Sequence, residues 1–451
     1  MTAQSNSTAK RSPLGPLPRG WTLATLKDLV LKVGSGATPL GGGGVYLSNR
    51  EKYALIRSQN VLDRRFSVEG LAYILNNDAM KLRSAEVQQG DVLLNITGDG
   101  VTFGRSCIVP EDILPACVNQ HVAIIRLKPD LCESGYLLSF FTHPLTKIYI
   151  ESFNSGGSRR AVTKGHIEAL KIPIPPLAEQ QAIAQTLGAL DDKIELNYKI
   201  ASTLEGVARA TFKSWFIDFD PVRAKADGRA PVGIDAATAA LFPDSFEKVQ
   251  GHEMPRGWQL CKLSNIANII MGQSPPGDSY NKDGNGLPFY QGARDFEFRF
   301  PKRRVFCTKP TRFAQANDVL LSVRAPVGRL NIAEEKCAVG RGISAIRLKN
   351  EHGGFLYYLL IENQFQLDRF DAEGTVFGSV SKDDLGGMNI IRPDSALVKQ
   401  FNQFVQLLDA QIMLNHQQSR LLEKTRNTLL PQLLSGKLRV RDAERAAEVV
   451  L

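Results

Sequence analysis

The stretch LGALDDKIELN (Leu187–Asn197) returns as VQLLDAQIMLN (Val405–Asn415), 218 residues further along the chain (405 − 187). The same interval separates Lys164 from Lys382. A register that is held over such a distance indicates an internal repeat, so the molecule is expected to have pseudo-two-fold organisation.

The register loosens towards the start of each half. LPRGW at 17–21 matches MPRGW at 254–258, an interval of 237 (254 − 17), whereas DVLL at Asp91 matches DVLL at Asp318, an interval of 227 (318 − 91). The order of the matching strings is the same in both halves, with insertions and deletions between them. Each half is therefore predicted to be one globular module that has diverged, followed by one helical segment that has not.

The helical segments carry a heptad pattern. Apolar residues recur at alternating steps of three and four, which is typical of a coiled-coil seam. Roughly 40 residues of helix would span about 60 Å, and two such helices most simply pair with each other. The predicted seam residues are Ile183, Leu187, Leu190, Ile194, Asn197 and Leu204 in the first segment and Phe401, Val405, Leu408, Ile412, Asn415 and Leu422 in the second.

Asn197 and Asn415 occupy the same seam position in the two copies. A polar residue there costs stability but can fix the register of the helices. The alternative is that one or both face solvent at a frayed seam.

The modules are predicted to be mixed α and β. Short β-rich runs such as VLLNI, HVAIIRL and KIPIPP alternate with Gly-rich and Ser-rich turns, and an apolar helical stretch interrupts them in each copy. The expected divisions are a disordered tail at 1–17, a first module at 18–176, a helical spacer and connector at 177–250, a second module at 251–393 and a helical spacer at 394–451. The aromatic cluster FKSWFIDFDPV (Phe212–Val222) is expected to be either core or a docking surface.

Composition narrows the class of protein. Lys and Arg exceed Asp and Glu by nine (55 − 46), which suits a polyanionic partner. The six cysteines have no zinc-site spacing and predict reduced thiols. The N-terminus resembles no signal peptide, and no apolar run reaches about 18 residues, so a soluble cytoplasmic protein is expected.

Catalytic motifs are absent from the sequence. There is no GxGxxG in a strand-turn-helix context, no P-loop, and no Asn/Asp-Pro-Pro-aromatic motif of an amino-methyltransferase, and the six histidines are scattered. We therefore expect a binding protein that is not an enzyme and holds neither a metal nor a cofactor.

Four strings together resemble the specificity subunit of type I restriction-modification systems. They are IPPLAEQQAIAQTL, LDDKIELNYKI, ATFKSWFIDFDPVRAKADG and LLPQLLSGKLRV, and the resemblance extends from Trp21 to Val440. It implies two target recognition domains, each of which reads one half of a split asymmetric site in double-stranded DNA, separated by two long helices in an antiparallel coiled coil.

The resemblance also implies the partners. One such chain would hold two methyltransferase (modification) subunits and two restriction (motor-nuclease) subunits. The assembled complex would be a site-specific deoxyribonuclease and an adenine-N6 DNA methyltransferase, and S-adenosylmethionine, ATP and Mg would bind to the partner subunits.

The internal comparison supports the same division of labour. The helices are alike, which suits two identical partner subunits, and the loops differ, which suits two unlike half-sites, expected about one helical turn or ~34 Å apart. The alternatives are a stand-alone basic DNA-binding or architectural protein, an adaptor that binds polypeptides, and a hidden enzyme, which the missing motifs make the weakest of the three.

Candidate DNA contacts are polar and basic residues beside the Gly-rich turns, because Arg, Asn and Gln can pair bidentately with bases. For each of them a solvated surface charge or a loop cap is the alternative. Arg57 or Asn60 to Ala is expected to weaken recognition of one half-site only. The candidates are Arg57, Gln59, Asn60, Arg105, Asn119, Gln120, His121, Ser158, Arg159, Arg160 and Lys164 in the first module and Gln291, Arg294, Arg324, Arg329, Arg341, Ser381 and Lys382 in the second.

Overall fold

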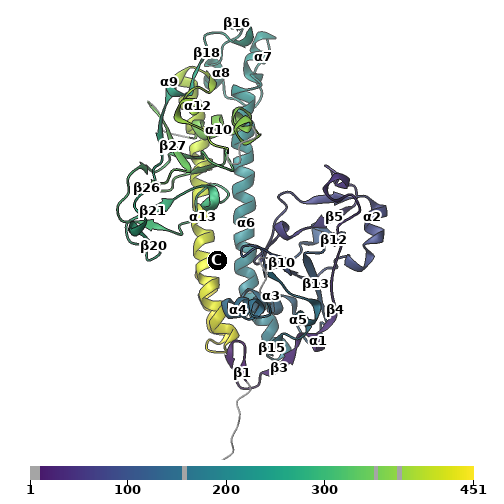
Figure 1. Cartoon of the computed structure of the whole chain (residues 1–451). Coiled ribbons are helices and arrows are strands. Elements are labelled where there is room, and N and C mark those ends of the chain that lie inside the picture. Colours follow the sequence, from purple (N-terminus) through teal and green to yellow (C-terminus); the bar gives the residue numbers. More distant parts are fainter. Residues whose placement is uncertain (1–10, 155–159, 350–353, 373–377) are drawn as a thin grey trace, which may run out of the picture. The chain divides into compact units, whose positions relative to one another are not determined.

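The computed structural model describes residues 11–154, 160–349, 354–372 and 378–451. The chain forms two compact units: unit one comprises residues 1–199 and 415–451, and unit two comprises residues 200–414. Two helices of 40 residues, α6 (Leu177–Phe216) and α13 (Ser395–Leu434), contribute to both units. Figure 1 shows α6 in teal and α13 in yellow as unbroken helices. Both were expected from the heptad pattern at about this length.

The module of unit one contains a four-stranded antiparallel sheet in the order β11-β9-β13-β4. A second sheet has the order β12-β5-β8, in which β5 and β12 run parallel. The strands are β4 (Val30–Ser35), β5 (Tyr53–Ile56), β8 (Ala72–Ile74), β9 (Val92–Asn95), β11 (Ser106–Ile108), β12 (Ala116–Val118) and β13 (Val122–Leu127).

The β9 strand shows why these runs are apolar throughout. Successive strand residues face opposite sides of a sheet. Val92 and Leu94 pack into the core that includes α3 (Ser134–Thr142), whereas Leu93 packs into the core beneath the second sheet. Both faces of β9 are therefore buried, and the sequence reads as a continuous apolar run.

The module of unit two repeats this plan, as the sequence predicts. Its antiparallel sheet has the order β19-β27-β24-β25, and its second sheet has the order β20-β22-β21-β26-β23 with β21 and β26 parallel. The strands are β19 (Ala267–Met271), β20 (Tyr280–Asn281), β21 (Leu287–Tyr290), β22 (Phe306–Cys307), β23 (Phe313–Ala314), β24 (Val319–Ser322), β25 (Leu330–Ile332), β26 (Cys337–Val339) and β27 (Ile343–Leu348). Helix α10 (Phe355–Glu362) occupies the place of α3.

The first and last strands of each module pair with each other, next to the start of a long helix. In unit one β3 (Thr22–Thr25) pairs with β15 (Lys171–Ile174), and in unit two β18 (Gln259–Lys262) pairs with β28 (Asn389–Arg392). Trp21, just before β3, is buried and donates from Nε1 to Glu179 Oε2 of α6 at 3.3 Å.

Helices α6 and α13 pack antiparallel in each unit. In unit one Asp191 pairs with Arg426 and Asn197 with Gln418, so partner numbers fall as residue numbers rise. In unit two Phe212 packs against Phe401 with ring centroids 5.5 Å apart. Of the seam residues, Ile194, Leu204 and Leu408 are partly buried, and the remaining ones, Ile183, Leu187, Leu190, Asn197, Phe401, Val405, Ile412, Asn415 and Leu422, are buried.

The aromatic cluster that follows the first heptad segment is core. Phe212, Trp215 and Phe216 of α6 are buried in unit two and pack against Phe355 and Phe401. The connector after it contains α7 (Asp220–Ala226), α8 (Ala236–Ala240) and a hairpin of β16 (Phe246–Val249) with β17 (His252–Pro255).

The chain ends differ from the expectation. Residues 11–16, expected to belong to a disordered tail, form a hairpin of β1 (Arg11–Ser12) and β2 (Gly15–Pro16), because Leu14 packs against the core of unit one and Gly15 takes a left-handed φ of 114°. The C-terminal spacer likewise contains a separate short helix, α14 (Val440–Glu448), whose Ala443 and Ala447 are buried in the same core. Within the described parts of the chain, no helix is both long enough and apolar enough to span a bilayer.

Candidate nucleic-acid interface

In unit one, loops from distant parts of the sequence meet at one end of the four-stranded sheet, where β4 and β9 end and β13 begins. We call this place edge one, formed by residues 36–38, 56–60, 95–98, 119–121 and 160–162. Backbone hydrogen bonds join the loops: Gly36 N donates to Asn119 O at 3.2 Å, and Ile96 N donates to His121 O at 3.0 Å. Six candidates named from the sequence, together with Arg160, are thereby brought to one place.

Glycine is required where two of these loops cross. A Cβ on Gly36 would lie 1.7 Å from Val118 O, and the corresponding Gly272 in unit two would place a Cβ 2.2 Å from Gly340 O. The chain therefore passes directly over the neighbouring loop in both modules, which explains a glycine immediately after the first strand of each sheet.

Some polar side chains of edge one, of which Gln120 is exposed and the others are half-buried, bond to one another or to the neighbouring helix. Gln120 accepts from Thr38 Oγ1, and His121 Nδ1 lies 2.5 Å from Thr97 Oγ1. Arg160 pairs with Glu151 of α4 (Pro144–Glu151) at 2.7 Å. Thr38 and Thr97 were not among the residues predicted from the sequence, since nothing in their local pattern separates them from other loop threonines.

The loop that carries Arg57, Gln59 and Asn60 divides into a surface part and a buried part. Gln59 is exposed, and Arg57 is half-buried with its guanidinium 5.2 Å from the ring of Tyr46. Asn60 is fully buried: it accepts from Arg57 N at 3.0 Å and donates to Ser67 O and Glu69 O at 3.0 and 3.2 Å. The direct base contact suggested for Asn60 is thus not available in this conformation, because the amide holds the loop together.

Asn119 also has a structural position. Its side chain is buried and accepts from His121 N at 3.0 Å, which shapes the turn that presents Gln120. The side chain of Asn119 therefore lies beneath the exposed surface of edge one.

The equivalent place in unit two is edge two, formed by residues 272–274, 290–294, 322–324, 340–342 and 378–380. It is built by the same hydrogen bonds: Val323 N donates to Gly342 O and Gly340 N to Tyr290 O, both at 2.9 Å. The matching bonds in edge one run from Ile96 N to His121 O and from Asn119 N to Ile56 O.

The exposed side chains of edge two differ from those of edge one at equivalent positions. Arg341 stands where edge one has Gln120 (341 − 120 = 221), and Arg324 stands where it has Thr97 (324 − 97 = 227). Both arginines are exposed, as are Arg294 and Gln291, and Gln291 Nε2 donates to Ser274 Oγ at 2.8 Å. The two edges thus share a backbone and differ in donors and acceptors.

Other candidates are the same in both modules. Arg105 and Arg329 follow the turn after β9 and β24: Asn95 N donates to Arg105 O at 2.8 Å and Ser322 N to Arg329 O at 2.9 Å. Lys164 and Lys382 are each the first residue of a short helix, α5 (Lys164–Glu168) and α12 (Lys382–Gly386).

These two lysines follow residues that cap their helices. The side chains of Thr163 and Ser381 accept from the backbone of the first turn, at His166 N and Asp384 N. Ser381 is therefore occupied as a cap, whereas Lys164 Nζ lies 3.6 Å from Glu168 Oε1, and both lysines are exposed. Ser158 and Arg159 lie outside the described residues.

Cys117, Cys132 and Cys337 are buried in the cores of the two units. Burial raises the pKa of the Cys117, Cys132 and Cys337 thiols to about 12, which keeps them protonated near neutral pH. Among the residues described, no three His, Cys, Asp or Glu side chains are grouped so that they could hold a metal ion.

Comparison with known proteins identifies the modules. Residues 18–206 and 255–425 both match the type I restriction modification DNA specificity domain, and together they account for most of the chain. The chain belongs to this family. Each match begins at a module and ends inside the long helix that follows it, so the specificity domain is a module together with most of its helix.

Relatives of this specificity-domain protein match over most of its length. The putative type I restriction enzyme MjaX specificity subunit of Methanocaldococcus jannaschii is 28% identical over 443 residues, covering 96% of this chain and 97% of that protein. The type I restriction enzyme HindI specificity subunit of Haemophilus influenzae is 26% identical over 408 residues, covering 78% and 87%. A solved structure of a type I restriction-modification S subunit from M. genitalium shares the fold, with a TM-score of 0.51 at 16% identity over 94% of this chain and 98% of that one.

Proposed function

We propose that each module reads one half of a bipartite, asymmetric DNA site with the side chains of its edge. The chain is a DNA specificity subunit, and the nuclease and methylase activities of such systems sit in partner subunits. The observation that carries the proposal is that edge one and edge two share their hydrogen-bonded backbone and differ in exposed donors at equivalent positions. The same backbone arrangement in both edges would fit the same geometry of double-stranded DNA at each half-site, and different exposed donors would pair with different bases.

The candidates divide accordingly into base readers and backbone contacts. Residues that differ between the modules are assigned to bases, because only they can distinguish two half-sites. Residues that are alike in both are assigned to phosphates, which look the same at every site. Base readers are Arg57, Gln59, Gln120, His121 and Arg160 in edge one and Gln291, Arg294, Arg324 and Arg341 in edge two; phosphate contacts are Arg105, Lys164, Arg329 and Lys382.

The partners are methylase and restriction subunits together with DNA. We assign two methyltransferase and two restriction subunits to each chain, because a pseudo-two-fold repeat offers every docking surface twice. We assign exposed apolar residues of the long helices to the docking of methyltransferases, separately in each unit. They are Leu196 and Leu421 in unit one and Val207, Leu407 and Leu414 in unit two. Their exposed fractions lie between 46% and 77%.

The remaining assignments follow from this role. S-adenosylmethionine, ATP and Mg belong to the partner subunits, and the complex works in the cytoplasm, where host DNA lies. The recognition domains are assigned to residues 18–176 and 251–393 and the helical spacers to 177–250 and 394–451.

The test uses the chain co-expressed with its methyltransferase, with N6-methyladenine mapped on host DNA by single-molecule sequencing. The expected parent result is one split, asymmetric motif. Gln120→Ala is expected to relax bases in one half-site only, and Arg341→Ala bases in the other only. A lost base contact is worth about 1 to 3 kcal/mol, or roughly 5-fold to 150-fold in discrimination.

Matched controls lie at the far ends of the same strands. Gln89→Ala, before β9, and Lys349→Ala, after β27, remove an exposed amide and an exposed cation away from the edges, and we expect both to leave the motif unchanged. A parent complex without a bipartite motif, or edge variants that each relax both half-sites, would overturn the proposal. Native mass measurement of the same complex tests the assignment of two methyltransferases per chain.

A further inference from the structure

Two buried arginines occupy equivalent places in the modules. Arg64 and Arg299 are 235 residues apart (299 − 64), within the range by which the modules repeat, and only 4% and 2% of their side chains are exposed. Neither lies on an edge, and neither reaches solvent far enough to contact DNA. Each is instead turned towards the long helices.

In unit one Arg64 joins the module to both helices through Asp191. Its Nε lies 2.6 Å from Asp191 Oδ2 of α6, and its Nη1 donates to Ser139 Oγ and Thr142 Oγ1 of α3 at 3.1 Å each. Arg426 of α13 lies 2.5 Å from the other carboxylate oxygen of Asp191. We call these groups lock one.

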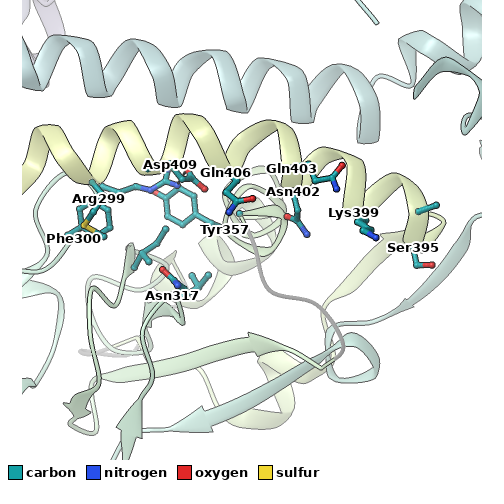
Figure 2. A pocket seen from close by; sticks show the side chains of 16 residues that line it. Arg299, Phe300, Asn317, Tyr357, Ser395, Lys399, Asn402, Gln403, Gln406 and Asp409 are labelled. Carbon is teal, nitrogen blue, oxygen red and sulfur yellow. Dashed lines mark hydrogen bonds and ion pairs between the residues drawn. The ribbon is translucent and has the colours of Figure 1, made fainter. Parts of the chain in front are cut away.

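In unit two Arg299 makes the corresponding connections, which we call lock two. Its Nη2 lies 2.5 Å from Asp409 Oδ1 of α13 and its Nη1 2.9 Å from Glu205 Oε2 of α6. Nη1 also donates to Tyr358 OH of α10 at 3.1 Å, and the guanidinium carbon lies 4.1 Å from the ring centroid of Tyr357. Figure 2 shows Arg299 extending beside the Tyr357 ring towards Asp409 on α13.

The two locks use equivalent residue positions in the two halves of the repeat. Asp191 and Asp409 are the same helix position (409 − 191 = 218), and Ser139 and Tyr358 are the same position of the module helix (358 − 139 = 219). In unit two one guanidinium contacts the module helix and both long helices. In unit one Arg64 contacts the module helix and α6, and the Asp191 carboxylate between Arg64 and Arg426 extends the connection to α13.

The physical role of such a cluster is geometric. A guanidinium is planar and donates in fixed directions, so three partners define its orientation. Burial raises the pKa of the Asp409 carboxyl, which Arg299 opposes, and burial lowers the pKa of Arg64, which Asp191 opposes. Because desolvation offsets most of the attraction in a buried pair, these contacts are expected to add little net stability and to select one orientation.

We propose that Arg64 and Arg299 are positioning residues that fix the angle of each module on the long helices and so determine which half-site spacing the protein accepts. The inference rests on the proposed bipartite reading. Adding one base pair to the spacer moves the second half-site by about 3.4 Å and turns it by roughly 34°. A module held at one angle cannot follow that rotation, whereas a module released from its lock can.

The experiment measures methylation by the complex with methyltransferase subunits on duplexes that carry both half-sites and the natural spacer, or one base pair more or less. Two variants release lock two. Arg299→Lys keeps the positive charge but loses the planar guanidinium and its paired N–H donors. Arg299→Met combined with Asp409→Leu and Glu205→Gln replaces the arginine and both of its carboxylate partners by uncharged side chains, so no buried charge of the cluster is left unpaired. In both, preference for the natural spacer is expected to fall at least tenfold, about 1.4 kcal/mol, while base discrimination inside each half-site stays unchanged.

Arg347→Met is the matched control, because Arg347 pairs with Asp318 inside module two at 2.5 Å, and within the described part of the chain its side chain makes no hydrogen bond or ion pair to either long helix. Melting curves of all variants show whether they are folded. The positioning role is refuted if folded lock variants keep the parent's spacer preference or lose activity equally on all spacers. A parent complex that methylates no bipartite duplex would instead refute the proposed function, so the two failures are distinguishable. Arg64→Lys repeats the test independently in lock one.

Discussion

Asn60→Ala should destabilise unit one and thereby impair one half-site indirectly. The Asn60 side chain is fully buried and makes three hydrogen bonds, to Arg57 N, Ser67 O and Glu69 O, at 3.0, 3.0 and 3.2 Å. Each bond contributes about 1 kcal/mol, and buried partners left unpaired add to the loss, so we expect a cost of about 3 kcal/mol. For a unit of this size, 1 kcal/mol corresponds to roughly 2 to 4 °C in Tm, giving a decrease of roughly 6 to 12 °C.

The assay combines melting of the purified chain with methylation of duplexes that contain each half-site. Gln59→Ala is the matched comparison, since Gln59 is exposed and makes one bond to Gly70 O at 3.2 Å. It should change Tm by no more than about 1 to 2 °C and weaken recognition of the half-site read by edge one. An Asn60→Ala protein with the parent's Tm that still loses that half-site would refute the structural role and restore Asn60 as a base contact.

Three further predictions concern the core and the helices. Asn197→Leu should raise Tm by a few degrees, because an apolar seam residue replaces a buried amide that donates to Gln418 and Ser419. Native mass spectrometry of this variant should show more than one assembled species, because the polar residue that fixes the helix register is lost. A lower Tm would contradict the first expectation. Phe212→Ala should cost about 3 to 5 kcal/mol, because the ring is fully buried among aromatic side chains; an unchanged melting curve with lost partner binding would mean that the cluster is a docking surface. Burial lowers the pKa of the His143 imidazole, so its neutral form favours folding. That contribution to stability is present above the ordinary pKa of about 6.5 and is lost as pH falls towards the lowered pKa of the folded protein. Tm should therefore fall less on acidification in His143→Asn than in the parent. Equal slopes of Tm against pH in the two proteins would argue against this role of His143.

Much of the fold could be predicted because the helices and strands depend on short-range patterns in the sequence. The heptad seam of Leu187 and Val405 depends only on spacing along one helix, and the strand β9 is readable from a short apolar run. The hairpin at residues 11–16 was missed because its two strands are short and depend on Leu14 reaching a distant core. The aromatic sequence around Phe212 is compatible with either core or surface, because that choice depends on distant residues such as Phe355 and Phe401.

The candidate site was predicted by residue type but not by role. The sequence indicates that polar residues lie beside Gly-rich turns, but it does not distinguish Asn60, Asn119 and Ser381 from Gln120. Exposure separates them: Asn60 and Asn119 are buried, and Ser381 is a helix cap. The short-range pattern around a loop residue carries no information about which side of the loop faces solvent.

By itself the sequence determined the duplication, the two long helices and the division into alike helices and unlike loops, because repeats and periodicity are properties of linear order. Only the tertiary structure decided that the loops at residues 36–38, 56–60, 95–98 and 119–121 form one edge, and that Arg64 and Arg299 are buried against Asp191 and Asp409. The two ion pairs join residues 127 and 110 positions apart (191 − 64 and 409 − 299), and the backbone bonds of the edge join residues 25 to 83 positions apart (121 − 96 and 119 − 36). Their geometry depends on how strands cross and helices pack, which no local sequence pattern specifies.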